Sequence, residues 1–178
     1  MEPEELIERL NIALGEFCRE EPDLFLQDAH EEAISTAFIK YLTNIFEHLN
    51  LNIDGQWDKR MIDNVVQKKQ TDFLITQLPI SKRNSGEIID DETIRKEVLP
   101  DIILHRRQDC NHNFLAIEIK KSTNLKTASK SYDHLKLSVY TNSDLNYNYG
   151  AYIEFCTGKD YKNEDPFSLI IFQNGVEL

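Results

Sequence analysis

The chain has 178 residues, with 20 Lys and Arg against 31 Asp and Glu, a net charge of −11, and 40% hydrophobic residues. This length suits one domain, and the hydrophobic content excludes wholesale disorder. The sequence has no apolar run near the roughly 20 residues that span a bilayer, and its start is acidic where a signal peptide is basic. Its three cysteines lie far apart, which is typical of a protein from a reducing compartment. These features predict a cytoplasmic domain with no membrane segment.

The charge is spread unevenly along the chain. Residues 1–50 hold 12 acidic and 3 basic side chains, whereas residues 101–140 hold seven basic and four acidic ones. Affinity for duplex DNA comes mainly from Lys and Arg that displace counterions, so a protein with this net negative charge is not expected to bind DNA strongly without regard to sequence. A locally basic surface on an acidic body still permits a polyanion to bind on one side.

Two helices are predicted in the first 50 residues. The first has Pro3 near its first turn, and the acidic segment 20–23 ends it. Its apolar stripe consists of Leu6, Leu10, Ala13, Leu14 and Phe17. The second helix is expected from about Asp28 to Leu49. Its stripe consists of Ile34, Phe38, Tyr41, Leu42, Ile45, Phe46 and Leu49.

The rest of the chain combines strand patterns with one further helix. Strands are predicted at 51–57, 71–77, 98–106, 113–120, 149–156 and 168–173. A helix is predicted at 128–141, a polar turn at 107–112, and a loop or irregular insertion at 78–97. The order predicts an α/β fold with helices around a mixed central sheet.

The two strongest strands form a predicted hairpin whose register can be calculated. With a turn near Cys110, the residue numbers of two paired residues add up to about 219–220. This register places Asp101 beside Glu118 and Ile119. Side chains alternate between faces, so Glu118 and Lys120 share one face with Asp101, and Ile119 faces the other side. Two adjacent carboxylates repel each other unless a proton, a basic side chain or a metal ion lies between them. Mg²⁺, held by one or two carboxylates and a substrate phosphate, would satisfy this pair.

Glu31 is a second anomaly. It lies within about 20–30° of the centre of the apolar stripe of the second helix. A carboxylate in a buried face is costly unless it is paired or bound to a metal. Its place at the helix start offers another explanation, because the helix dipole favours an acid in the first turn. Both interpretations stay open at this point.

These residues resemble the PD-(D/E)XK nuclease superfamily, which has the restriction-endonuclease-like fold. The resemblance covers roughly residues 28–157. Its two motifs are Pro100-Asp101 and Glu118-Ile119-Lys120, whose acids are seventeen residues apart. It extends to Glu31 on the preceding helix and to Asp133-x-x-Lys136 on the following one. The segment from Arg60 to Glu97 looks longer than a minimal core of this family needs.

The resemblance implies an αβββαβ core within one domain, residues 1–178. The N-terminal acidic helix would then occupy 1–27, the core 28–157, and a C-terminal strand 158–178. It also implies a site for Mg²⁺ or Mn²⁺ and hydrolysis of phosphodiester bonds in nucleic acid, with DNA the expected substrate. The expected metal ligands are Asp101, Glu118, the Ile119 carbonyl and Glu31. The expected catalytic residues are Asp101, Glu118, Glu31 and Lys120, with Lys120 beside the attacking water.

Alternatives apply to these assignments. The side chains expected to bind nucleic acid are Lys121, Lys126, Lys130, Lys136 and Arg106, although most such lysines belong to a solvated face. The acids and lysine of the hairpin could equally form a surface salt-bridge cluster. The alternative function is a catalytically inactive nuclease-fold module that binds a protein partner. The acidic N-terminal helices are candidate surfaces for a homodimer or a larger assembly.

Overall fold

A six-stranded mixed sheet lies at the centre of the computed structural model. The structure describes residues 1–62, 65–107, 109–124 and 127–178, and it describes their side chains except at 60–62 and 109–111. In spatial order its strands are β1 (Asn52–Gly55), β7 (Ile102–Arg106), β8 (Asp109–Lys121), β9 (Tyr147–Phe155), β10 (Phe167–Gln173) and β11 (Val176–Glu177). Neighbouring strands are antiparallel except β8 and β9, which are parallel. The predicted α/β class with a mixed central sheet is confirmed.

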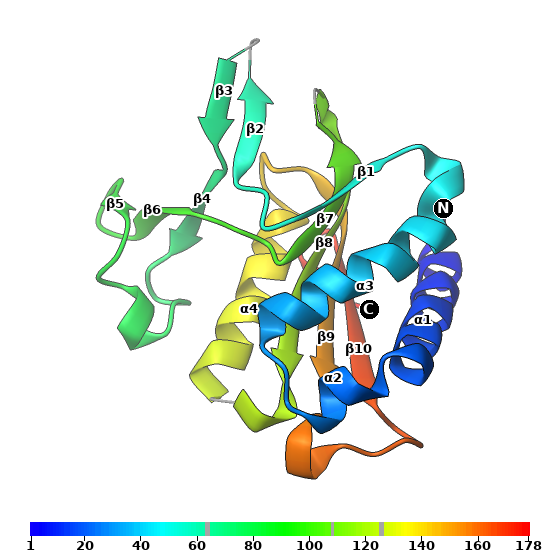
Figure 1. Cartoon of the computed structure of the whole chain (residues 1–178). Coiled ribbons are helices and arrows are strands. Elements are labelled where there is room, and N and C mark those ends of the chain that lie inside the picture. The colour runs from blue at the N-terminus through cyan, green and yellow to red at the C-terminus, as the bar shows by residue number, and fades with distance from the viewer. Residues whose placement is uncertain (63–64, 108, 125–126) are drawn as a thin grey trace.

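Helices cover both faces of this sheet (Figure 1). On one face lie α1 (Pro3–Glu20), α2 (Pro22–Leu26) and α3 (Glu31–Phe46). On the other lies α4 (Thr127–Tyr140), which makes the crossover that the parallel pair β8 and β9 requires. Short 3-10 helices follow several elements: η1 (Glu47–Leu49), η2 (Ile80–Lys82), η3 (Ser122–Asn124) and η4 (Gly158–Asp160). No described helix has the length and apolar character that crossing a bilayer requires.

The apolar stripes of α1 and α3 form the larger core. Every residue predicted for the α1 stripe is buried, and Phe17 is its aromatic centre. The Phe17 ring centroid lies 5.2 Å from those of Phe25 and Phe38, and 5.7 Å from that of Phe155 on β9. These contacts join both helices to the sheet, so the N-terminal helix is part of the same core.

The hairpin register is confirmed where it matters for the site. Ile102 pairs with Ile117, Ile103 with Ala116, and Leu104 with Leu115, so each pair sums to 219. Alternation then sends Ile102, Leu104, Ile117 and Ile119 into the core beneath α1 and α3, and Ile103 and Ala116 towards α4. The even-numbered side chains of β8 near its end therefore face α4.

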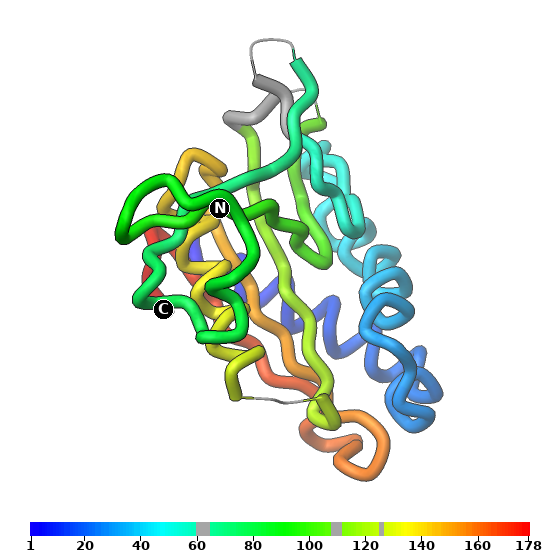
Figure 2. Tube along the Cα trace, turned by 90° about the vertical axis from the view of Figure 1, so that its left-hand side faces the viewer, coloured from blue at the N-terminus to red at the C-terminus, as the bar shows by residue number. Residues whose placement is uncertain are grey.

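An insertion at 59–97, called the insertion below, lies beside α4 (Figures 1 and 2). It contains the hairpin of β2 (Lys59–Ile62) and β3 (Val65–Lys68), and a sheet of β4 (Gln70–Leu74), β6 (Thr93–Glu97) and β5 (Glu87–Ile88), in that order. Its buried residues Phe73, Leu78 and Ile94 join the core on the α4 side. The insertion is thus attached to the sheet face that carries Glu118.

Several predicted boundaries were wrong. Residues 78–97 are not a loop throughout, because β6 pairs with β4 over its whole length. The strand expected at 98–106 begins only at Ile102. Pro100 has no N–H for a ladder, and the Val98 N–H donates to the Lys69 carbonyl of the insertion instead.

Short elements account for the other differences. β8 begins at Asp109, so the turn is shorter than 107–112 and is not centred near Cys110. Arg106 pairs with Asp109, and two register shifts separate this pair from that of Leu104 and Leu115. The α2 helix and the β2–β3 hairpin were not predicted, because four- and five-residue elements carry too little periodicity to be recognised. α3 is shorter than expected at both ends, and its final turn is η1.

Candidate functional site

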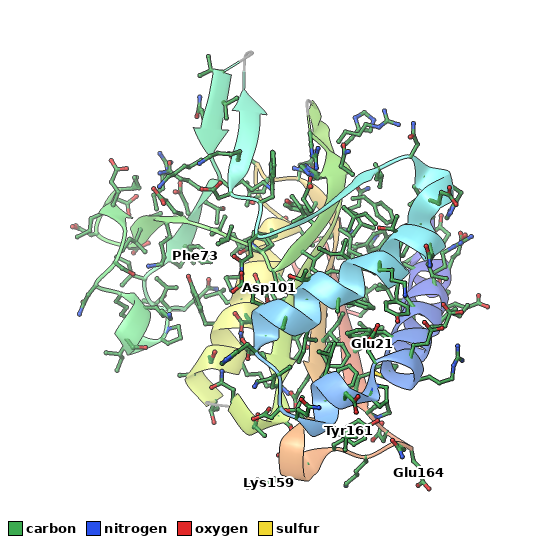
Figure 3. The ribbon with its side chains drawn as sticks, viewed as in Figure 1. Glu21, Phe73, Asp101, Lys159, Tyr161 and Glu164 are labelled. Carbon is green, nitrogen blue, oxygen red and sulfur yellow. The ribbon has the colours of Figure 1, made fainter. Side chains whose placement is uncertain are left out.

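Asp101 lies just before β7 and is bound to the backbone of β8 (Figure 3). Its Oδ2 accepts a hydrogen bond of 2.7 Å from the Ile119 N–H. Continuing the observed register places Asp101 level with Glu118. In an antiparallel ladder the N–H and C=O of one residue point to the same neighbour, so the Ile119 carbonyl faces this edge too. The hairpin therefore brings together the acids that the register predicted.

Glu118 is almost completely buried, with 1% of its surface exposed. Its Oε2 lies 2.6 Å from Lys136 Nζ, and its Oε1 accepts a hydrogen bond of 3.4 Å from the Tyr140 hydroxyl. Burial raises the pKa of Glu118 to about 8, and the charges of Asp101 and Asp133 add to this effect against the opposing charge of Lys136. Burial likewise raises the pKa of Asp101. Glu118 therefore tends to keep a proton near neutral pH even with Lys136 beside it.

Asp133 on α4 connects the two lysines of the site. Its Oδ1 lies 2.7 Å from Lys136 Nζ and its Oδ2 lies 3.2 Å from Lys120 Nζ. Asp133 is buried, and among the described residues its Oδ2 accepts no hydrogen bond of good geometry, although Lys120 lies within ion-pair distance. This oxygen retains an unused acceptor site within the cluster.

Glu31 reaches the cluster through Lys120. As the first residue of α3, it places its Oε2 3.4 Å from Lys120 Nζ, and its Oε1 accepts a hydrogen bond of 3.2 Å from Asn124. Burial alone would lower the pKa of Lys120, but the carboxylates of Asp133, Glu31 and Asp101 outweigh burial and raise it. Glu31 is thus both a first-turn acid and a partner of a buried cation, as the two open interpretations allowed.

The carboxylate–lysine cluster comprises Glu31, Asp101, Glu118, Asp133, Lys120 and Lys136. Four carboxylates face two ammonium groups in it, so the fully ionised cluster carries two uncompensated negative charges. Within the described ranges, no group of three or more His, Cys, Asp or Glu side chains is arranged to hold a metal ion. The oxygen-only donors, the surplus negative charge and the unused Asp133 oxygen nevertheless fit a divalent cation such as Mg²⁺ or Mn²⁺.

The residues predicted to bind nucleic acid are only partly brought to the site. Lys136 belongs to the cluster, and Lys130 lies 3.2 Å from Glu154 on β9. The side chain of Lys121 is buried on the α3 side, where its Nζ binds the carboxylate and carbonyl of Asp28. Arg106 is exposed five residues along the strand from Asp101, roughly 17 Å away.

Lys121 and Arg106 therefore do not line the cluster. Lys121 follows Lys120 directly, and alternation sends consecutive side chains to opposite faces. Lys126 lies outside the described residues.

Sequence reasoning understated the part played by α4. Asp133, Leu137 and Tyr140 occupy positions i, i+4 and i+7, so Asp133 lies in the buried stripe of its helix, and Lys136 flanks it. The same test that singled out Glu31 would have identified Asp133 as a buried acid in need of a cation. The partner of Asp133, by contrast, depends on how α4 packs over β8.

The chain was compared with models of known protein families, with curated proteins and with solved structures. No match was found. The function must therefore be inferred from the chemistry of the cluster.

Proposed function

We propose that the protein is a divalent-metal-dependent nuclease of the PD-(D/E)XK type, with a restriction-endonuclease-like core. The succession of α3, β1, β7, β8, α4 and β9 supports this proposal, because its first three strands are antiparallel and its last is parallel to β8. The observation that carries it is the hydrogen bond from the Ile119 N–H to Asp101. This bond holds the Asp101 carboxylate against β8, next to Glu118.

The residues of the cluster have distinct proposed roles. Asp101, Glu118 and the Ile119 carbonyl would hold Mg²⁺ or Mn²⁺, which supplies Lewis acidity and lowers the pKa of bound water. Lys120, kept charged by its neighbours, orients the attacking water and stabilises negative charge on the phosphate. Glu31 and Asp133 hold the ammonium group of Lys120 between them.

The same contacts favour a second candidate, an inactive nuclease-fold module that binds a protein partner. Lys136 already compensates Glu118 at 2.6 Å, so the cluster is partly neutralised by its own side chains. The surplus of acids in the first 50 residues would suit a basic partner. DNA as the substrate, cytoplasmic location and assembly through the acidic N-terminal helices stay predictions.

A cleavage panel tests the nuclease proposal. Labelled single-stranded DNA, duplex DNA and RNA are incubated with the protein in Mg²⁺, Mn²⁺ or EDTA. Cleavage in either metal, lost in EDTA and in Asp101→Asn and Lys120→Ala, is the expected result. Asn keeps an oxygen that can accept the Ile119 N–H, so Asp101→Asn removes the charge with little change of shape.

The matched control is Lys159→Ala, because Lys159 is exposed on η4. Absence of cleavage of every substrate, together with no calorimetric heat on addition of either metal, would favour the inactive module. Undiminished cleavage by Asp101→Asn would refute the roles proposed for the cluster.

A further inference from the structure

A pocket of about 610 Å³ opens between the insertion and α4. The insertion contributes most of its lining, including Lys82, Ser85 and Lys96, and α4 contributes Tyr132. The proposed nuclease chemistry uses none of these residues. The pocket adjoins the cluster, since Lys136 of the cluster lies close to the ring of Tyr132.

Two cations of the pocket, Lys82 and Lys96, form no ion pair with a carboxylate in the part of the chain that the structure describes. Lys96 is 6% exposed, and its Nζ donates only to neutral oxygens: the Lys82 carbonyl at 3.0 Å, the Ser85 hydroxyl at 2.6 Å and the Ser85 carbonyl. Burial and the positive charge of Lys82 both lower the pKa of Lys96. Lys82 is exposed and, within the described residues, forms no ion pair.

Most other charged side chains of the pocket form ion pairs with oppositely charged neighbours. Arg95 makes a two-bond contact with Asp72, at 2.7 and 2.9 Å, and Glu97 lies 2.7 Å from Lys68. Glu87, at the exposed rim, is the remaining acid of the lining. The pocket therefore keeps a positive surplus inside a protein of net charge −11, which is the electrostatic character of an anion site.

Tyr132 joins this pocket to the cluster. Lys82 Nζ lies 5.3 Å from the centroid of the Tyr132 ring, and Lys136 Nζ lies 5.4 Å from it. Lys136 in turn contacts Glu118. Lys82 of the pocket and Lys136 of the cluster therefore both lie beside the Tyr132 ring, which puts the pocket next to the cluster.

The loop of the pocket depends on Gly86. Its φ is +130°, and a Cβ at this position would lie 2.5 Å from the Arg95 carbonyl. Only glycine allows the backbone to approach β6 so closely. This approach keeps Ser85 over Lys96 and so fixes the shape of the pocket.

We propose that the pocket binds a backbone phosphate of a nucleic-acid strand adjacent to the phosphate at the cluster, with Lys82 as its direct contact. Lys96 and Ser85 form the floor of this subsite, and Tyr132 forms its wall towards Lys136. The inference rests on the proposed function for its ligand class. It assigns the insertion to substrate binding rather than to the core.

Fluorescence anisotropy in EDTA tests this subsite without any cleavage. Labelled single-stranded and duplex DNA are titrated with wild type, Lys82→Gln and Lys82→Glu over a series of salt concentrations. One lost phosphate contact should weaken binding about tenfold at 50 mM salt for Lys82→Gln, and should reduce the salt slope by about 0.7–0.9. Lys82→Glu should bind DNA more weakly still. If the loss of affinity is larger for single-stranded than for duplex DNA, or the reverse, the form with the larger loss is the one that the pocket binds.

Lys159→Gln is the matched control, because Lys159 is exposed and lies at the bottom of the view in Figure 3, away from the insertion residue Phe73. It should bind as wild type does. Equal affinity of Lys82→Gln and wild type, or no binding by wild type at low salt, would overturn the subsite.

These outcomes are separable from those of the nuclease proposal. Binding that depends on Lys82 without cleavage in any metal would support the subsite and refute the nuclease. Cleavage with affinity independent of Lys82 would do the reverse.

Discussion

Lys136 Nζ lies 2.6 Å from Glu118 Oε2, which makes a lysine of α4 the direct partner of the buried acid of β8. The same ammonium group lies 2.7 Å from Asp133. One side chain thereby compensates two buried carboxylates. Its role in stability and its role in catalysis can be separated by substitution.

Above the folded pKa of Glu118, which is about 8, Lys136→Met is expected to lower stability by about 3–5 kcal/mol, because it leaves the ionised Glu118 and Asp133 buried without their shared cation. For a chain of this length, that corresponds to a fall of roughly 10 °C in Tm. Calorimetry in EDTA measures it. The double variant Lys136→Met/Glu118→Gln should lose less than the sum of the two single variants, since the pair is coupled. Strict additivity would show that the contact contributes little.

Glu118→Gln is expected to change how stability depends on pH. In the absence of divalent ions, the folded pKa of about 8 exceeds the ordinary value of 4.5, so between these pH values the folded state holds a proton that the unfolded chain has released. The stability of the wild type should therefore fall as pH rises from 4.5 to 8. In Glu118→Gln this component disappears. Urea unfolding in EDTA at pH 5 and pH 8 measures the difference, and parallel pH profiles for both proteins would contradict the prediction.

Glu31→Gln is expected to reduce cleavage about tenfold, as is typical for a group that orients a catalytic residue. Because the Glu31 carboxylate helps to raise the pKa of Lys120, its loss should also move the alkaline limb of the pH–rate profile to lower pH. Steady-state rates from pH 6 to 10 measure both effects. A lower rate with an unmoved alkaline limb would show that Glu31 acts by another route.

Asp54→Asn tests a buried contact on β1, the strand beside β7, where Asp54 pairs with Ile103. Asp54 on β1 accepts hydrogen bonds from Arg107 and contacts His105 Nε2 at 2.8 Å. The Arg107 hydrogen bond and the His105 contact hold the pKa of Asp54 below its usual value against the opposing effect of burial. Loss of these charged hydrogen bonds should cost about 2 kcal/mol.

Cleavage per folded molecule should be unchanged in Asp54→Asn, because the Asp54 carboxylate is bound to Arg107 and His105 and not to a residue of the cluster. Thermal melts and cleavage rates measured below the melting range separate the two effects. A selective loss of activity in a fully folded variant would place Asp54 in the catalytic machinery.

The hairpin that carries Asp101 and Glu118 could be predicted because its signals are local. A run of apolar residues at alternate positions fixes which side chains share a face. The position of the turn was not predicted correctly, because two register shifts separate Leu104 from the pair of Arg106 and Asp109. The pairs that sum to 219 nevertheless confirm the calculated register near the site. The stripe of α1 was equally predictable, since 3.6-residue periodicity is visible in the sequence alone.

The insertion was the least predictable part of the fold. Its strands have two to five residues, and their partners are distant in sequence, as when Gln70 pairs with Glu97. Such short strands have little periodicity of their own. Their pairing depends on Phe73 and Ile94 reaching the core on the α4 side, which no local pattern reveals.

By itself, the sequence determined the α/β class, the faces of the hairpin, and the presence of Asp101, Glu118 and Lys120 on one of them. Only the tertiary structure decided which cation each acid contacts: Lys136 for Glu118, Lys120 for Glu31, and both for Asp133. The physical reason is that periodicity specifies the direction of a side chain within its own element. Ion pairs and pockets, including the one at Lys82, depend on how separate elements pack together in space.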